Sequence, residues 1–175
     1  MSSTNPKLTL AELMAQFPHP GELVWIGLRP AKSQPMLSVA EVFADKNSGL
    51  TGDRYRGRDA KRQVTLLQWE HLAVLTALTG KTLSPELLRR NLVVKGLNLL
   101  ALKNHYFQIG SAVFKGTGQC HPCSRMEVIL GAGGYNAMRG HGGLTAEIVA
   151  SGDIHIADPV IALPLHPQAN DKTLT

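Results

Sequence analysis

The sequence has only two cysteines among its 175 residues, which is too few for the disulfide framework of a small secreted protein. Aromatic residues make up only 5% of the chain, so no stacking platform for single-stranded nucleic acid is expected. No apolar run approaches the roughly 20 residues of a membrane span, and no basic, hydrophobic and cleavable signal sequence opens the chain. We therefore expect a cytoplasmic protein with reduced thiols that binds neither nucleic acid nor membrane.

Hydrophobic residues make up 43% of the chain, enough for a real core in a single domain. Eighteen Lys and Arg outnumber thirteen Asp and Glu, which gives a net charge of +5. This excess favours an anionic partner, and a small phosphorylated molecule suits it better than a nucleic acid; a solvated basic face is the alternative. The densest basic cluster comprises Arg54, Arg56, Arg58, Lys61 and Arg62, followed later by Lys81, Arg89 and Arg90.

Hydrophobic periodicity and the positions of glycine and proline indicate the order of elements. Strands come in clusters with short turns and helices are inserted between them, which favours a mostly β or α+β barrel over an alternating parallel sheet. A short amphipathic helix starting near Thr9 lies in an N-terminal extension, residues 1–20; the domain spans 21–163 and a flexible tail 164–175. Expected strands are 22–28, 36–44, 63–67, 92–94, a hairpin over 106–114 that turns near Gly110, and a final pair, 144–149 and 153–163. Expected helices are 68–78, with Trp69, Leu72, Leu75 and Leu78 in the core and Gly80 placed to end it, a short one capped by Ser84 with Pro85 in its first turn, and 124–130.

Polar residues gather in the connections between these elements. The loop 47–57 contains three glycines together with Asp53 and Arg54, which are candidates for ligand contact or for pairing with each other. Arg89 and Asn91 lie at a helix-to-strand junction, where an arginine fork suits phosphate or the last helical carbonyls. Residues 131–143 contain six glycines and could close over a ligand.

Both thiols lie in one motif, Cys120-His121-Pro122-Cys123, where an expected strand gives way to an expected helix. A thiolate near a helix N-terminus is favoured by the helix dipole, and His121 and Arg125 add positive charge. Structural zinc usually needs four protein ligands, and no second cysteine pair is present. A thioredoxin-like dithiol needs a βαβ pattern, whereas the flanks here look antiparallel. Two ordinary cysteines at a turn, or a reactive thiolate that holds a soft metal or carries sulfur, are the other interpretations.

Several motifs together resemble the MOSC domain, which is named for the C-terminal part of molybdenum cofactor sulfurases. The similarity runs from about Glu22 to Leu163, and the arrangement is most similar to the small stand-alone bacterial members. The resemblance implies a MOSC-type β-barrel with helices attached. The matching motifs are Gly49-Leu-Thr-Gly-Asp-Arg54, Arg89-Arg-Asn-Leu-Val-Val94, Ile109-Gly-Ser-Ala-Val-Phe114, Cys120-His-Pro-Cys123 and Ile156-Ala-Asp-Pro-Val160.

The resemblance also implies a site. Relatives of the amidoxime-reducing type bind a pterin-based molybdenum cofactor (molybdopterin) and hold the metal through one cysteine, a position that falls on Cys123. Cys120 is then a supporting or resolving thiol, so these two are the catalytic candidates. The residues expected at the cofactor are Arg54, Arg62, Arg89, Asn91, Arg125 and His121.

The implied activity is two-electron reduction of N-hydroxylated small molecules. No ferredoxin-like iron–sulfur motif occurs in the sequence, so the electrons are expected from a partner protein. The alternative is a non-redox sulfur carrier, in which Cys123 receives a persulfide from a sulfur donor. A zinc-stapled interaction module is the third hypothesis. The sequence assigns no oligomeric state.

Overall fold

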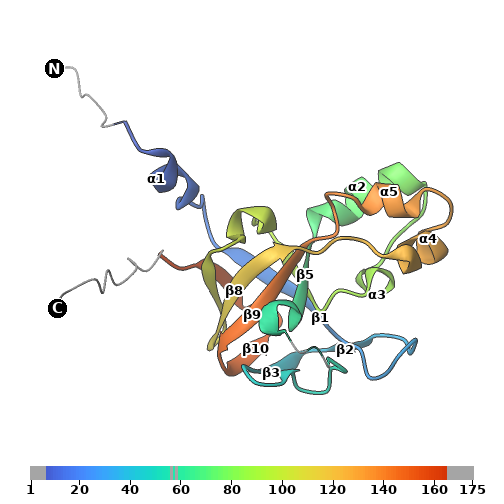
Figure 1. The fold of residues 1–175 in the computed structure, drawn as a ribbon, viewed down its shortest axis with the longest axis horizontal. Coiled ribbons are helices and arrows are strands. Elements are labelled where there is room, and N and C mark those ends of the chain that lie inside the picture. Colours follow the sequence, from blue (N-terminus) through green and yellow to red (C-terminus); the bar gives the residue numbers. More distant parts are fainter. Residues whose placement is uncertain (1–6, 56, 58, 165–175) are drawn as a thin grey trace, which may run out of the picture.

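The computed structural model describes residues 7–55, 57 and 59–164. Seven strands close into a barrel in the order β11-β7-β8-β9-β5-β6-β1, and a pairing of β11 with β1 completes it (Figure 1). The β5–β6 pair is parallel, so the barrel is mixed. The prediction of a mostly β barrel with inserted helices is confirmed. Its strands are β1 (Gly21–Leu28), β5 (Val64–Gln68), β6 (Leu92–Lys95), β7 (Tyr106–Ile109), β8 (Ala112–Gln119), β9 (Leu144–Ala150) and β11 (Pro159–Ala162).

The four remaining strands correct two predictions. The single strand expected over 36–44 is two strands: β2 (Leu37–Val39) extends the barrel sheet beside β1, whereas β3 (Glu41–Asp45) joins a second sheet. That second sheet has the order β10-β3-β4, with β4 at Gly49–Leu50 and β10 at Gly152–His155. The expected strand 153–163 is likewise two strands, and neither pairs with β9, because β10 pairs with β3 while β11 pairs with β7 and β1. Pairing partners depend on distant segments, which local periodicity does not encode.

The helices gather mainly on one side of the barrel, where α2, α4 and α5 lie together (Figure 1). Pro85 in the first turn begins α3, as predicted, but the Ser84 side chain makes no capping hydrogen bond. Gly80 ends α2 in the left-handed conformation, also as predicted. The helices are α1 (Leu10–Met14), α2 (Glu70–Thr79), α3 (Pro85–Leu88), α4 (Ser124–Leu130) and α5 (Gly134–Met138), with 3-10 turns η1 (Ala60–Arg62) and η2 (Leu99–Leu102).

The barrel strands under the helices are buried on both faces, which explains their continuous apolar runs. Leu66 points into the barrel core while Leu67, the next residue, packs among the helices, and Leu92 and Val93 divide in the same way. The stacked rings of Phe107 and Phe114, with centroids 5.4 Å apart, fill the barrel. The second core is formed by Trp25, Met36, Leu67, Leu72, Leu75, Leu88, Val93, Met126, Leu130 and Met138, and it fixes α3, α4 and α5 over the strands.

Helix α2 contributes less to this core than its periodicity predicts. Leu72 and Leu75 are buried, but Trp69 is 42% exposed and Leu78 is 58% exposed, so their placement in the core is wrong. Only the middle of the helix contacts the layer below it. Leu78 lies in the last turn before Gly80 and extends past that layer.

The N-terminal extension contains the predicted helix. Thr9 caps α1 through a capping box with Glu12, because each side chain meets the other residue's backbone N–H. The helix projects from the barrel in Figure 1, and none of its residues is buried. Among the described residues, no helix is both long and apolar enough to cross a membrane.

Candidate functional site

Cys123 lies at the junction of strand and helix, as the sequence predicts. Strand β8 ends at Gln119, and Cys123 is the N-cap residue of α4 with extended backbone angles (φ −118°, ψ 171°). Its side chain makes no capping hydrogen bond, and both cysteines are free thiols. Cys123 is exposed, whereas Cys120 is buried. The Cys123 sulfur is therefore the one that a ligand from solvent can reach.

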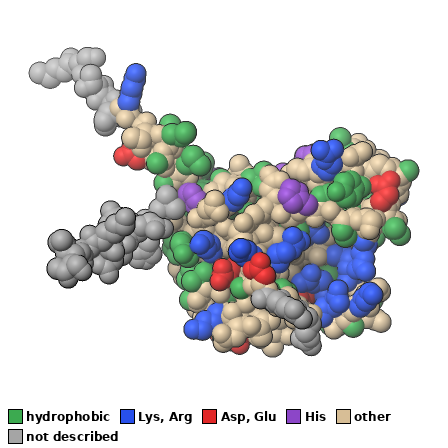
Figure 2. All heavy atoms as spheres, in the orientation of Figure 1, with side chains coloured by type: hydrophobic (Ala, Val, Ile, Leu, Met, Phe, Trp, Pro, Cys, Tyr) green, Lys and Arg blue, Asp and Glu red, His purple; other side chains and the backbone are tan. Residues whose placement is uncertain are grey.

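A hollow of about 400 Å³ lies beside this sulfur, and we call it the thiol hollow. Guanidinium groups arrive there from β1's end, the 51–55 loop, the end of α3 and the first turn of α4. None of its described lining residues is acidic, and Figure 2 shows Lys and Arg side chains gathered around a hollow between the α3–α4 region and β2. The lining residues are Arg29, Arg54, Arg89, Arg90, Cys123, Ser124, Arg125 and Met126.

Arg89 shows the electrostatic cost of this arrangement. It is the C-cap residue of α3 and has a left-handed backbone conformation (φ 55°). Its Nη1 donates to the Gln34 carbonyl at 2.8 Å, but its buried Nη2 has no partner among the described residues. Burial lowers the pKa of Arg89, and the positive charges of Arg125, Arg29 and Arg54 lower it further, against the opposing effect of Asp53. An anion in the hollow would relieve both the repulsion and the unpaired N–H.

Arg29 is held in place by Asp53. The Asp53 carboxylate accepts from the Arg29 backbone N–H (2.7 Å), Nε (3.0 Å) and Nη2 (2.7 Å), and also from the Tyr55 backbone N–H (3.1 Å). The Asp53 side chain is 1% exposed. Of the two roles expected for Asp53 and Arg54, ligand contact or pairing with each other, the pairing is wrong, because Asp53 pairs with Arg29. Arg54 contributes its backbone N–H to the Arg29 carbonyl at 2.7 Å, and its guanidinium makes no hydrogen bond or ion pair with another described residue.

Asn91 belongs to the framework behind the arginines. Its amide donates to Asp53 Oδ1 (3.1 Å) and the Gly27 carbonyl (3.2 Å), and its Oδ1 accepts from the backbone and hydroxyl of Thr65. The side chain is fully buried and does not line the thiol hollow. The structure thus joins Asn91 to the site through Asp53 and Arg29.

Arg62 lines an adjoining hollow of about 470 Å³, which we call the tyrosine hollow. Arg29 and Arg54 line both hollows, so the two share a wall. The remaining lining residues are Tyr55, Gly57, Asp59, Arg62 and Thr65.

Cys120 and His121 face a different part of the surface. Cys120 is 3% exposed and borders a narrow cavity, while His121 lines an outer hollow of about 630 Å³ together with Asn136 and Arg139. The glycine-rich segment, residues 131–143, packs against the Cys120 backbone. A Cβ at Gly142 would lie 2.0 Å from the Cys120 carbonyl oxygen, and the Cys120 N–H donates to the Gly143 carbonyl. The structure brings neither residue into the thiol hollow.

The buried Arg90 joins these two regions. Its Nε donates to the Gly142 carbonyl at 2.8 Å and its Nη2 to the Cys120 carbonyl at 3.4 Å, so it holds the strand before Cys123 against the glycine-rich segment. That segment is not all loop, because residues 134–138 form α5. Among the residues the structure describes, no three His, Cys, Asp or Glu side chains converge as metal ligands, so the zinc hypothesis gains no support.

A match to one family model identifies the family of this chain. The MOSC domain model matches residues 45–161, which is more than half of the chain. The chain belongs to the MOSC domain family. That family is associated with molybdenum cofactor binding. No curated protein matches the sequence.

Solved structures share the MOSC fold at low sequence identity. The YuaD protein from Bacillus subtilis is 17% identical, with a TM-score of 0.72 over 83% of this chain and 97% of that one. YiiM from Geobacillus stearothermophilus is 15% identical, with a TM-score of 0.68 over 82% of this chain and 75% of that one. YiiM from Escherichia coli is 16% identical, with a TM-score of 0.64 over 86% of this chain and 71% of that one. These likenesses establish the fold alone.

Sequence reasoning missed Arg29, the arginine that lines both hollows of this MOSC domain. A signal was present, because Arg29 follows β1 directly and precedes Pro30, as a side chain at a barrel rim would. Its partner Asp53 stands in the Gly-Asp-Arg motif, but 24 residues separate the two in sequence. The pairing becomes visible only once the barrel closes.

Proposed function

We propose that this MOSC protein binds a pterin-based molybdenum cofactor in the thiol hollow and reduces N-hydroxylated compounds. The single observation that carries the proposal is the exposed Cys123 thiol beside a hollow lined by arginines from four separate segments. A thiolate is a soft ligand suited to molybdenum. Arginine forks suit the phosphate and other anionic groups of such a cofactor.

The residues present fit that cofactor. Among the described residues, the buried Nη2 of Arg89 has no partner, and the site around it has several positive charges and no acidic lining residue, so an anionic guest satisfies both deficits. Cys123 would hold the metal, while Arg89, Arg54 and Arg125 would bind the anionic groups. When bound, the cofactor supplies the two-electron redox chemistry, which protein side chains lack.

The protein's own contribution is binding and orientation. Arg29 is fixed by Asp53 and so presents its remaining N–H groups in one direction. The Arg54 guanidinium, which is exposed and makes no hydrogen bond with another described residue, can move onto a ligand. The overall reaction breaks the N–O bond of an N-hydroxylated compound, consumes two electrons and two protons, and releases water. The electrons come from a partner electron-transfer protein.

The test uses protein produced in a host that makes the cofactor. Wild-type protein should carry about one molybdenum and one pterin per chain, and it should reduce benzamidoxime with reduced methyl viologen as electron donor. Cys123→Ser should lose the molybdenum and all turnover. Cys120→Ser is the matched control and should retain much of both, because its sulfur lies outside the thiol hollow. Full metal content and activity in Cys123→Ser would end the proposal.

A sulfur carrier is the second candidate, and the exposed, uncapped Cys123 thiol favours it. In that case the Cys123 thiolate would attack the outer sulfur of a cysteine persulfide on a sulfur-donor protein, which forms the persulfide on Cys123 and leaves the donor cysteine as a thiolate. Cyanide-releasable sulfur on the wild-type protein without molybdenum, absent from Cys123→Ser, would support this function in place of reduction.

A further inference from the structure

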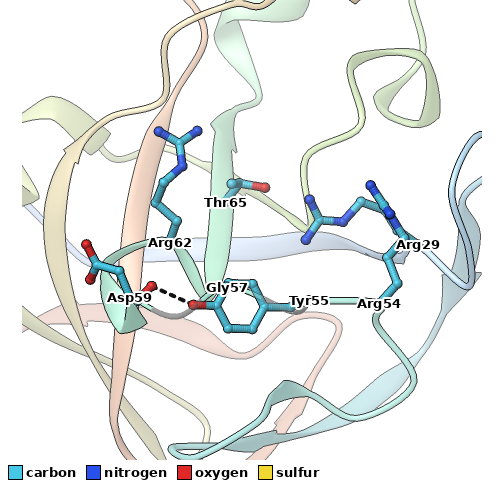
Figure 3. Close-up of a pocket in the computed structure, with 7 residues that line it drawn as sticks. All are labelled: Arg29, Arg54, Tyr55, Gly57, Asp59, Arg62 and Thr65. Atoms are coloured by element: carbon cyan, nitrogen blue, oxygen red, sulfur yellow. Dashed lines mark hydrogen bonds between the residues drawn. The ribbon is translucent and has the colours of Figure 1, made fainter.

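The tyrosine hollow adjoins the thiol hollow, and the side chains of Arg29 and Arg54 line both. Figure 3 shows the Tyr55 ring between Asp59 and Arg54, with Arg62 near Asp59 and Arg29 near Arg54. The hollow therefore has one end at the shared arginines and another end at Arg62. A molecule lying along it would reach toward Cys123 with one end only.

Tyr55 forms a fixed flat wall of this hollow. Its hydroxyl donates to the Asp59 carbonyl at 2.5 Å, and burial together with the nearby Asp59 charge raises the pKa of Tyr55, so the hydroxyl keeps its proton at neutral pH. A Cβ at Gly57 would lie 2.4 Å to 2.6 Å from three atoms of the ring and hydroxyl, so the Gly57 backbone packs against the tyrosine. A ring held in this way contributes stacking without a further ordering cost when a ligand binds.

The far end of the hollow carries the positive charge of Arg62. The Arg62 guanidinium is exposed and makes no hydrogen bond or ion pair with any other residue that the structure describes. The Asp59 carboxylate is occupied in part by the Lys61 backbone N–H, from which it accepts at 2.9 Å. Arg62 is thus available to a carboxylate or a similar acid group at the end opposite Cys123.

We propose that the tyrosine hollow binds the substrate, and that the substrate is a small planar aromatic compound carrying an acid group. The aromatic ring lies against Tyr55, and the acid group pairs with Arg62. The reacting group extends past Arg54 into the thiol hollow. The assignment of this ligand as substrate rests on the proposed reductase function, whereas its binding to the hollow does not.

Binding is measured on cofactor-free protein by chemical-shift titration of its backbone amides. The probes are nicotinate, nicotinamide, which lacks the charge, and cyclohexanecarboxylate, which lacks the aromatic ring. Nicotinate should bind at least fivefold more tightly than either of the others. Arg62→Gln should abolish its advantage over nicotinamide, and Tyr55→Leu its advantage over cyclohexanecarboxylate, while Tyr55→Phe keeps both.

Two controls separate this hollow from its neighbours. Arg139→Gln, in the outer hollow beside His121, should leave all three affinities unchanged. Cys123→Ser should also leave them unchanged, because the thiol does not line the tyrosine hollow. In the loaded enzyme, Arg62→Gln should raise KM at least fivefold for 4-carboxybenzamidoxime, with little change for benzamidoxime or in kcat.

Equal affinity of wild-type protein for nicotinate and nicotinamide would overturn the proposal. Loss of pterin and molybdenum in Arg62→Gln would also overturn it, because the hollow would then belong to the cofactor, and the proposed function would still stand. Failure of the proposed function appears instead as wild-type protein without molybdenum, a result on which the nicotinate titration does not depend.

Discussion

Replacing Asp53 by Asn tests the framework beneath the arginine-lined site. The exchange keeps the shape of the side chain, but it removes the negative charge that Arg29 faces at 2.7 Å and turns one acceptor into a donor. Among the described residues, the groups that contact this carboxylate are all donors: three from Arg29, one from Tyr55 and one from Asn91. The amide must therefore leave at least one of these donors without an acceptor.

The expected loss of folding stability is large because one member of the ion pair, Asp53, is almost completely buried. Breaking a buried ion pair by removing one partner costs roughly 3–5 kcal/mol. The Arg29 side chain is 20% exposed and the Asp53 side chain 1%, so the lower end of that range, about 3 kcal/mol, applies. At about 2–4 °C per kcal/mol for a chain of this size, the midpoint of thermal unfolding should fall by roughly 6–12 °C.

Urea unfolding followed by tryptophan fluorescence measures this loss. Asp153→Asn is the matched control, since Asp153 is exposed and its carboxylate makes no hydrogen bond with another described residue; it should change stability by less than about 0.5 kcal/mol. A double-mutant cycle of Asp53→Asn with Arg29→Gln should give a coupling energy above about 1.5 kcal/mol. A coupling near zero, or a loss from Asp53→Asn that matches the control, would refute the reasoning.

Two further predictions concern the helical side of the barrel. Burial lowers the pKa of His71 below its usual 6.5, and the charge of His141 lowers it further. Just below pH 6.5, His71 is therefore protonated in the unfolded chain but neutral in the folded chain. The contribution of His71 to stability should therefore be full above pH 6.5 and should be lost as the pH falls toward the pKa of the folded state. Between pH 7 and pH 5 the midpoint of thermal unfolding should fall less in His71→Asn than in the wild-type protein. Equal slopes in the two proteins would contradict this assignment. Gly143→Ala should abolish soluble, folded protein, because a Cβ there would lie 1.8 Å from the Leu66 carbonyl oxygen and the residue has φ +92°. At Gly133 an added Cβ would have no atom within 4 Å, so the Gly133→Ala protein should remain folded. Its positive φ should lower stability by about 1 kcal/mol.

Local signals predicted most elements of the fold. The start of α1 near Thr9, the end of α2 at Gly80 and the hairpin turn at Gly110 each depend on residues within a few positions of one another, and each is present. The place of Cys123 between a strand and a helix was predictable for the same reason. The strand 36–44 was not, because its division depends on β3 pairing with β10, more than a hundred residues later in the chain.

The candidate site was predictable only as a list of residue types. The motif Cys120-His-Pro-Cys123 suggests one dithiol site, but the chain folds so that Cys120 is buried beside the glycine-rich segment and Cys123 is exposed to the thiol hollow. Arg62 was also expected at the cofactor, but in the fold it lines the adjoining tyrosine hollow. Asn91 resembles a ligand contact in sequence and is a fully bonded framework residue in the structure.

The sequence by itself determined the continuous apolar runs that bury both faces of the central strands, the turns between them and a thiol at the start of α4, since each depends on neighbours along the chain. Only the tertiary structure decided that Arg29, Arg54, Arg89 and Arg125 meet around Cys123. These arginines belong to four segments that are distant in sequence, and the closure of the barrel brings their ends together at one rim. Their mutual repulsion opposes that meeting, and the packing of the two cores holds them in place against it.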